Sequence, residues 1–116
     1  MENLVDRRAG GGNHDPTDER SLVMVIGLLQ AQLSIPDSRS LKDKRQVLRS
    51  LKDRAINKWN VSVAEVDKQD LWQAAVLAFV TVAAEKVVVE KRLSEIADAL
   101  RGDPRYVLLD YETQLI

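Results

Sequence analysis

The segment from Leu71 to Ala83 places the strongest constraint on how this chain can fold. Between Ala74 and Val80 every residue is apolar. Successive side chains of a strand point to opposite faces of a sheet, so this strand presents apolar side chains on both faces. We therefore expect a central strand whose second face is covered by something.

Three further segments have strand patterns. From Leu22 to Ile35 a continuous apolar run gives way to strict alternation, which predicts a long strand with one buried face that ends at Pro36. The β-branched stretch 61–66 precedes the polar turn 67–70, so it should form a hairpin with the return strand 71–83. Residues 105–116 alternate again and predict a last strand.

Two segments have helical patterns. Ser40 offers a hydroxyl N-cap, with Asp43 placed to reach back as in a capping box, and an apolar stripe then repeats until Asn60 closes the helix. The second helix runs from Glu85 to Arg101, with Gly102 just beyond it.

The resulting order is βαββαβ. With right-handed crossovers it predicts an α+β, ferredoxin-like sandwich, in which two helices cover one face of a four-stranded antiparallel sheet. We expect residues 21–116 to form this single domain. Residues 1–20 contain three consecutive glycines, many charges and few large apolar side chains, so they are expected to form a flexible N-terminal tail.

Composition excludes several kinds of site. The chain has no cysteine and one histidine, His14, so disulfides, thiolate nucleophiles and paired-imidazole sites are ruled out. We find no phosphate-binding glycine loop and no nucleophile with a histidine base, and we predict no catalytic residue, metal site or cofactor. Without a long apolar segment or a secretory leader, a cytoplasmic protein with no membrane contact is expected.

Positive charge is concentrated in residues 36–58, which carry eight Lys or Arg against three Asp or Glu, although the whole chain has a net charge of −1. On a helical wheel several of these cations form a ridge beside the apolar stripe. Such a ridge is suited to contact RNA phosphates without a preference for base sequence. We do not expect DNA to be a ligand. The alternative is a solvated flank that shields the edge of the core. The candidate RNA-binding residues are Arg39, Lys42, Lys44, Arg45, Arg49 and Lys52.

Lys44 and Trp72 leave alternatives open. Lys44 falls in the apolar sector of the wheel, where it either snorkels over the first turn or meets a specific acidic partner. Trp72 falls on the same side of the return strand as Val76 and Val80, where the three could pave the open face of the sheet as an interface with a partner or a second copy, or be covered within the chain.

Two motifs carry a family resemblance. The helix segment Ser40-Leu41-Lys42-Asp43-Lys44-Arg45 and the hairpin segment that includes Glu65, Asp70 and Trp72 resemble the YlxP-like family of small bacterial proteins of unknown function. The resemblance covers about Met24 to Leu115. It implies a ferredoxin-like fold and a gene placed among translation and ribosome-maturation genes, but no activity and no role for these residues.

Two functions are therefore expected to compete. The first is a non-enzymatic accessory factor that binds ribosomal RNA or a ribosomal particle through the basic helix. The second is an interaction or homodimerisation module that uses the open face of the sheet around Trp72, Val76 and Val80.

Overall fold

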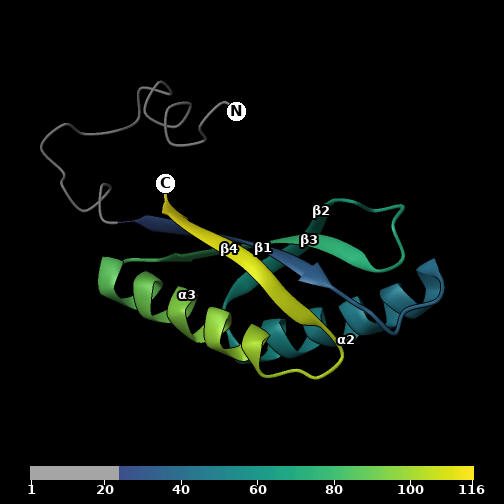
Figure 1. Cartoon of the computed structure of the whole chain (residues 1–116). Helices are drawn as coiled ribbons and strands as arrows, with labels where there is room; N and C mark the ends of the chain where they lie inside the picture. Colours follow the sequence, from purple (N-terminus) through teal and green to yellow (C-terminus); the bar gives the residue numbers. More distant parts are fainter. Residues whose placement is uncertain (1–23) are drawn as a thin grey trace, which may run out of the picture.

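The computed structural model describes residues 24–116, and the predicted tail, residues 1–20, lies outside them. Four strands and two helices follow one another in the predicted order βαββαβ (Figure 1). The strands pair antiparallel in the order β2-β3-β1-β4, which confirms the ferredoxin-like arrangement. The elements are β1 (Val25–Ser34), α2 (Leu41–Lys58), β2 (Val61–Asp67), β3 (Ala74–Ala83), α3 (Lys86–Arg101) and β4 (Val107–Leu115).

Both helices lie on the same face of the sheet, and the core fills the space between the two layers (Figure 1). β1 supplies Leu29, Ala31 and Leu33 to this core at alternating positions, as its sequence pattern predicts. Gly27 lets β1 approach α3 closely, because a Cβ atom at this position would collide with the side chain of Val89. The buried apolar face of each element therefore meets the other layer.

Helix α2 begins as predicted. The hydroxyl of Ser40 accepts a hydrogen bond from the backbone N–H of Asp43 at 3.0 Å, so Ser40 is the N-cap. The Asp43 carboxylate reaches back to the backbone N–H of Arg39 at 2.9 Å, one residue before the cap. The helix ends at Lys58, and Trp59 rather than Asn60 is its C-cap.

The start of β3 differs from the prediction. Pairing with β1 begins at Ala74, opposite Ser34, and residues 71–73 belong to the loop between β2 and β3. Hydrogen bonds tie this loop to α2 and to the β1–α2 loop, although Leu71 and Trp72 continue the apolar run of the sequence. Trp72 is therefore a loop residue and not a strand residue.

The second face of the sheet is open among the described residues. None of the four strands contains Lys or Arg, whereas β4 carries Asp110 and Glu112. All cations of residues 24–116 are thus placed in the helices and loops. Neither of the two helices in this part of the chain is long and apolar enough to cross a membrane.

Candidate functional site

The Lys44 side chain is buried at the end of the molecule where α2 begins. It is 1% exposed, and its ammonium nitrogen donates to Glu65 Oε2 at 2.8 Å. It also donates to the backbone carbonyls of Lys68 at 3.0 Å, Gln69 at 3.2 Å and Ala74 at 3.2 Å. An ammonium without such acceptors would be costly to bury, so the oxygens of the β2–β3 loop explain why a lysine occupies an apolar sector of α2.

This burial removes Lys44 from the predicted RNA-binding ridge. Of the two alternatives left open by the sequence, the acidic partner is confirmed and snorkelling is wrong. The physical reason is that the strand β2 brings the Glu65 carboxylate beneath the first turns of α2, where a hydrogen-bonded ion pair replaces hydration of the ammonium.

A second set of bonds ties the β2–β3 loop to the β1–α2 loop. The backbone N–H of Ile35 donates to the Gln73 carbonyl at 2.9 Å. The Gln73 side-chain amide donates to the carbonyls of Pro36 at 3.1 Å and Ser38 at 3.0 Å. Trp72, next to Gln73, is nevertheless 54% exposed. The loop therefore holds a large aromatic ring in solvent on an anchored backbone.

The remaining ridge residues lie on the outer flank of α2. Arg39 lies just before the helix, and the positions of the other four on the helix fall between about 20 and 100 degrees, whereas the flank toward α3 carries Arg54 and Lys58. Within residues 24–116 none of the ridge side chains forms an ion pair. The ridge consists of Arg39, Lys42, Arg45 and Arg49, which are exposed, and Lys52, which is half-buried.

The ridge and the exposed tryptophan share one end of the molecule. In Figure 1 the start of α2 and the β2–β3 loop lie at the same end. The bond between Gln73 and the Ser38 carbonyl places the neighbours of Trp72 and Arg39 in contact. The sequence alone placed the aromatic residues apart from the ridge, and the loop geometry brings the segment that contains Trp72 next to the segment that contains Arg39.

The three predicted interface residues do not form one patch. Trp72 lies in the loop, and Val76 is only 4% exposed. Val80 is exposed on the open face together with Val82, and the register places these two opposite Leu28 and Ile26 of β1. The apolar surface of the open face is thus centred on Ile26, Leu28, Val80 and Val82.

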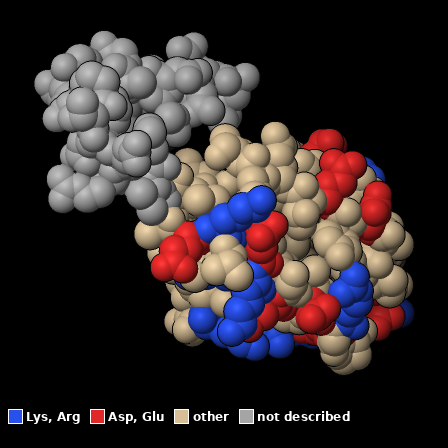
Figure 2. Space-filling view, turned by 90° about the vertical axis from the view of Figure 1, so that its left-hand side faces the viewer, with Lys and Arg blue, Asp and Glu red and all other residues tan. Residues whose placement is uncertain are grey.

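Figure 2 shows how charge is divided between the two layers on the face that it draws. Lys, Arg, Asp and Glu side chains lie close together in the lower part, where the helices are. The middle of the upper part, on the sheet side of the molecule, is uncharged, and its right-hand edge carries acidic side chains. The strand sequences explain this division, because they contain no cation.

A second buried charge, Asp103, was not singled out from the sequence. Its carboxylate accepts from Arg105 Nη2 at 2.7 Å and from Arg54 Nη2 at 2.5 Å. Hydrogen bonding to Arg105 holds the pKa of Asp103 well below its usual range. The run Asp103-Pro104-Arg105 is typical of a turn in which Asp accepts from the backbone two residues on, as Arg105 N–H does at 2.8 Å, and this signal could have marked the site.

Comparison with known proteins identifies the family of this chain. The model of the family described as "Protein of unknown function (DUF503)" matches residues 26–113. The chain belongs to this family. It is also 38% identical over 72 residues to the uncharacterized protein YlxP of Bacillus subtilis (strain 168). The aligned region covers 62% of this chain and 78% of that protein. The resemblance to the YlxP-like family is thereby confirmed.

The DUF503 family description assigns no activity, and neither does the name of the Bacillus relative. Among solved structures, a de novo designed protein, Foldit4, is similar with a TM-score of 0.45 and 15% identity over 80% of this chain and 96% of that one. The function of this DUF503 member must therefore be argued from its own surfaces.

Proposed function

We propose that this protein is a non-enzymatic accessory factor that binds RNA, as ribosomal RNA or within a ribosomal particle, at the end formed by the start of α2 and the β2–β3 loop. The observation that carries the proposal is the ridge, whose cations have no ion-pair partner within residues 24–116, together with the anchored loop that exposes Trp72 at the same end of the molecule. The setting among translation genes that the family resemblance implies is consistent with such a ligand.

The ridge suits a phosphate backbone. Lys42, Arg45 and Arg49 follow one another along a single flank of α2, and no carboxylate of residues 24–116 neutralises them. Each phosphate contact releases counterions, which gives affinity that falls with salt and does not depend on base sequence. The sheet offers no comparable surface, since its strands carry carboxylates and no cations.

Trp72 supplies the second element of the proposed site. An exposed indole can stack on an unpaired base, an interaction that tolerates any base and is worth about 1–3 kcal/mol. The bonds of Lys44 and Gln73 hold the flanking backbone in place, so little loop ordering is needed on binding. The proposed surface thus reads single-stranded or loop RNA by charge and stacking.

The test is binding of the full chain to purified ribosomal subunits and to a short unstructured RNA across a salt series. Replacing Lys42 and Arg45 by Gln should lower the magnitude of the salt slope for single-stranded RNA by about 1.4, because two phosphate contacts are lost. Trp72→Ala should weaken binding with no change in the slope.

The matched control replaces two exposed cations of α3, Lys86 and Lys91, by Gln. It changes the net charge by the same amount but leaves the ridge intact, so affinity should stay close to that of the wild type. Equal weakening by both pairs, or absence of binding at low salt, would refute the proposed site.

A second candidate function is self-association through the open face of the sheet. It is favoured by the exposed Val80 and Val82 beside the half-buried Ile26 and Leu28, in a face without Lys or Arg. Sedimentation velocity should then show a dimer that Val80→Lys disrupts. Val87→Lys, on α3, is the control. A monomer at high concentration would remove this candidate.

A further inference from the structure

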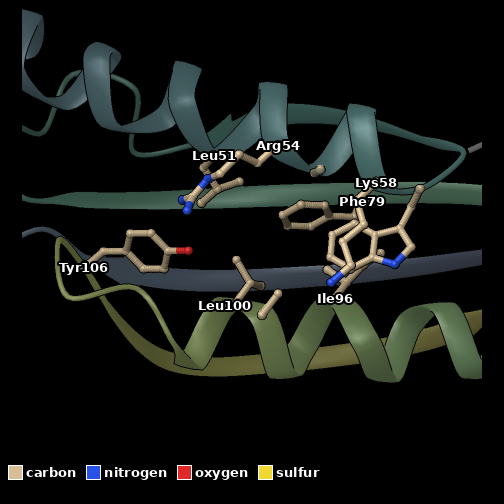
Figure 3. Close-up of a pocket in the computed structure, with 10 residues that line it drawn as sticks. Leu51, Arg54, Lys58, Phe79, Ile96, Leu100 and Tyr106 are labelled. Carbon is tan, nitrogen blue, oxygen red and sulfur yellow. The ribbon is translucent and has the colours of Figure 1, made fainter.

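The helical side of the sheet has a cavity between the helices and a groove at the β4 edge. The cavity, of about 190 Å³, is lined mostly by apolar side chains such as Leu51 and Phe79, and Arg54, which is bonded to Asp103, stands at one of its ends (Figure 3). No buried side-chain nitrogen or oxygen of residues 24–116 lacks a hydrogen-bond partner, so this cavity presents no unsatisfied group to a ligand. The groove, of about 290 Å³, lies between α3 and β4 and borders a free strand edge.

The outer side of β4 presents backbone groups that are free to bond another strand. β4 is the last strand in the sheet order and pairs with β1 on one side, so its other side has no partner strand among the described residues. The backbone N–H of Ile116 donates to the Ile26 carbonyl at 2.8 Å. In an antiparallel pair the backbone groups of successive residues point alternately toward and away from the partner strand. Those of Tyr111, Thr113 and Leu115 therefore point outward, away from β1.

This edge lacks the usual protection against strand addition, which is a lysine, a proline or a bulge. β4 contains neither lysine nor proline, and its pairing with β1 is regular from Asp110 to Leu115. One outward N–H, that of Tyr111, is bonded to the Asp110 carboxylate at 2.9 Å. The outward N–H groups of Thr113 and Leu115 have no hydrogen-bond partner within residues 24–116. The edge is thus a regular template with free donors.

The groove lies directly beside these free groups. Tyr111, Thr113 and Leu115 line it from β4, and Leu93 and Ala97 are among the residues that line it from α3. Side chains of a strand added next to β4 point alternately to the two faces of the sheet. Those on the helical face would therefore enter the groove, where the apolar side chains of Leu93 and Leu115 favour apolar contacts.

The open face beside the same edge is acidic. Asp110 and Glu112 are exposed there, opposite Gln32 and Gln30 of β1, and neither carboxylate forms an ion pair within the described chain. Opposite charges on neighbouring strands stabilise the pairing, whereas like charges destabilise it. An added strand should therefore carry Lys or Arg on the open face, at alternate positions.

A second copy of this chain does not supply such a strand. None of the four described strands contains Lys or Arg. Two β4 strands paired about a two-fold axis would also bring the acidic side chains of both copies onto one face of the joined sheet, where they repel one another. The charge of this edge thus favours a different chain.

We propose that the β4 edge binds an extended segment of another protein in which Lys or Arg alternates with apolar residues. Its backbone adds a strand to the sheet, its cations lie beside Asp110 and Glu112, and its apolar side chains enter the α3–β4 groove. The site lies at the opposite edge of the sheet from β2, on which α2 packs, so it does not depend on the proposed RNA surface.

The experiment is a titration of the isotope-labelled full chain with a synthetic peptide in which Lys and Val alternate over about eight residues, the length of an ordinary strand. We expect saturable shifts along β4, and slower hydrogen exchange at the amides of Thr113 and Leu115, which gain acceptors on the added strand. A peptide of the same composition, with its lysines and valines in two blocks, keeps the charge but cannot place it on one face. It should bind about tenfold more weakly, because several cross-strand pairs are lost.

Variants locate the contacts. Asp110→Asn combined with Glu112→Gln should weaken the alternating peptide about fivefold. Asp37→Asn combined with Asp53→Asn is the matched control, because it removes two exposed carboxylates from the region of α2 and should leave the affinity unchanged. Thr113→Pro removes one outward N–H without breaking a bond to β1, so the protein should fold and bind the peptide more weakly.

Three results would overturn the proposal. The first is equal binding of the alternating and the block peptide, and the second is wild-type affinity in the variant that lacks the charges of Asp110 and Glu112. The third is exchange at Thr113 and Leu115 that the alternating peptide does not slow. If exchange at these amides instead slows as the concentration of the protein alone is raised, a second copy occupies the edge, and the proposal of a different chain is wrong.

Discussion

Lys44 and Asp103 are the buried charged residues of the described chain, and each anchors a loop in a different way. Lys44 is a cation that donates to oxygens of two strands, β2 and β3, and of the loop between them. Asp103 is an anion that accepts hydrogen bonds from two guanidinium groups, those of the exposed Arg54 and the half-buried Arg105. One charge is enclosed by its partners, and the other is neutralised by partners that remain in water.

Because of this difference, removing the charge of Lys44 and removing the charge of Asp103 should have different consequences. Loss of the Lys44 ammonium leaves a carboxylate and three carbonyls without their donor, and the loop that exposes Trp72 loses its support. Loss of the Asp103 carboxylate leaves guanidinium groups that water can solvate, because Arg54 is 59% exposed. The first anchor should therefore contribute more to stability, and the second should be the one that acid disrupts.

The largest expected effect is that of Lys44→Met, which keeps the length of the side chain but removes the charge. Because it leaves Glu65 without its ion-pair partner, we expect the free energy of unfolding to fall by about 3–4 kcal/mol, measured by urea denaturation. Lys42→Met, two residues earlier and exposed, is the control and should change stability by less than about 0.5 kcal/mol.

The same variant should also release Trp72. In a Trp59→Phe background, where Trp72 is the one tryptophan left, Lys44→Met should lower the fluorescence anisotropy of the indole as the loop loses its anchor. A small loss of stability with unchanged anisotropy would contradict the idea that Lys44 holds this loop.

Asp103→Asn should have the next largest effect, about 2–3 kcal/mol at neutral pH, because charged hydrogen bonds to both arginines are weakened. The pKa of Asp103 is lowered in the folded protein from 3.8, mainly by the Arg105 hydrogen bond. A group with a lowered folded pKa stabilises the protein fully above its unfolded pKa and loses this contribution as the pH falls.

The gap in stability between wild type and Asp103→Asn should therefore be constant above about pH 5 and shrink as the pH falls below 3.8. Denaturation at a series of pH values measures this gap. Asp98→Asn, at an exposed position on α3, serves as the control and should show no such narrowing. A gap at pH 2.5 as large as the gap at pH 5 would show that the carboxylate charge is not what anchors the turn.

The sequence predicted the fold more completely than it predicted the contacts of Lys44 or of Asp103. Alternation in β1, the Ser40 cap and the two helical stripes are local patterns, and they fixed the element order that the structure confirms. The predicted start of β3 was wrong because Leu71 and Trp72 are apolar and continue its pattern, although they belong to a loop that Lys44 and Gln73 tie to α2 and to the β1–α2 loop. Local pattern cannot register such long-range bonds.

The candidate sites show the same limit. The wheel identified Lys44 as anomalous, but its partner Glu65 lies 21 residues away, and their contact depends on how α2 crosses β2. The cavity between the helices is lined by residues from α2, β3, α3 and the turn before β4, so no single segment of the sequence could have predicted it. The ridge needed only helical periodicity, and its RNA contact stays a prediction, as does the partner interface.

Glu65→Gln separates charge from hydrogen bonding at the first anchor. The amide oxygen can still accept from Lys44, so we expect a loss of about 1–2 kcal/mol in urea denaturation, less than for Lys44→Met. The double variant Lys44→Met with Glu65→Leu should recover part of the loss, because it removes both charges of the pair together. A larger loss for Glu65→Gln than for Lys44→Met would show that the carboxylate, and not the ammonium, is the group that holds the loop.

The smallest expected effect distinguishes the two arginines of the second anchor. Arg105 binds Asp103 through Nε and Nη2 and also through its backbone, whereas Arg54 makes one side-chain bond from an exposed position. Arg54→Gln should therefore cost less than about 1 kcal/mol in thermal or urea unfolding, and Arg105→Gln should cost more. Because Arg54 bridges α2 to the turn after α3, its loss should also free one end of the interhelical cavity. An Arg54→Gln variant less stable than Arg105→Gln would mean that this bridge between the helices, and not the turn itself, is what the buried carboxylate stabilises.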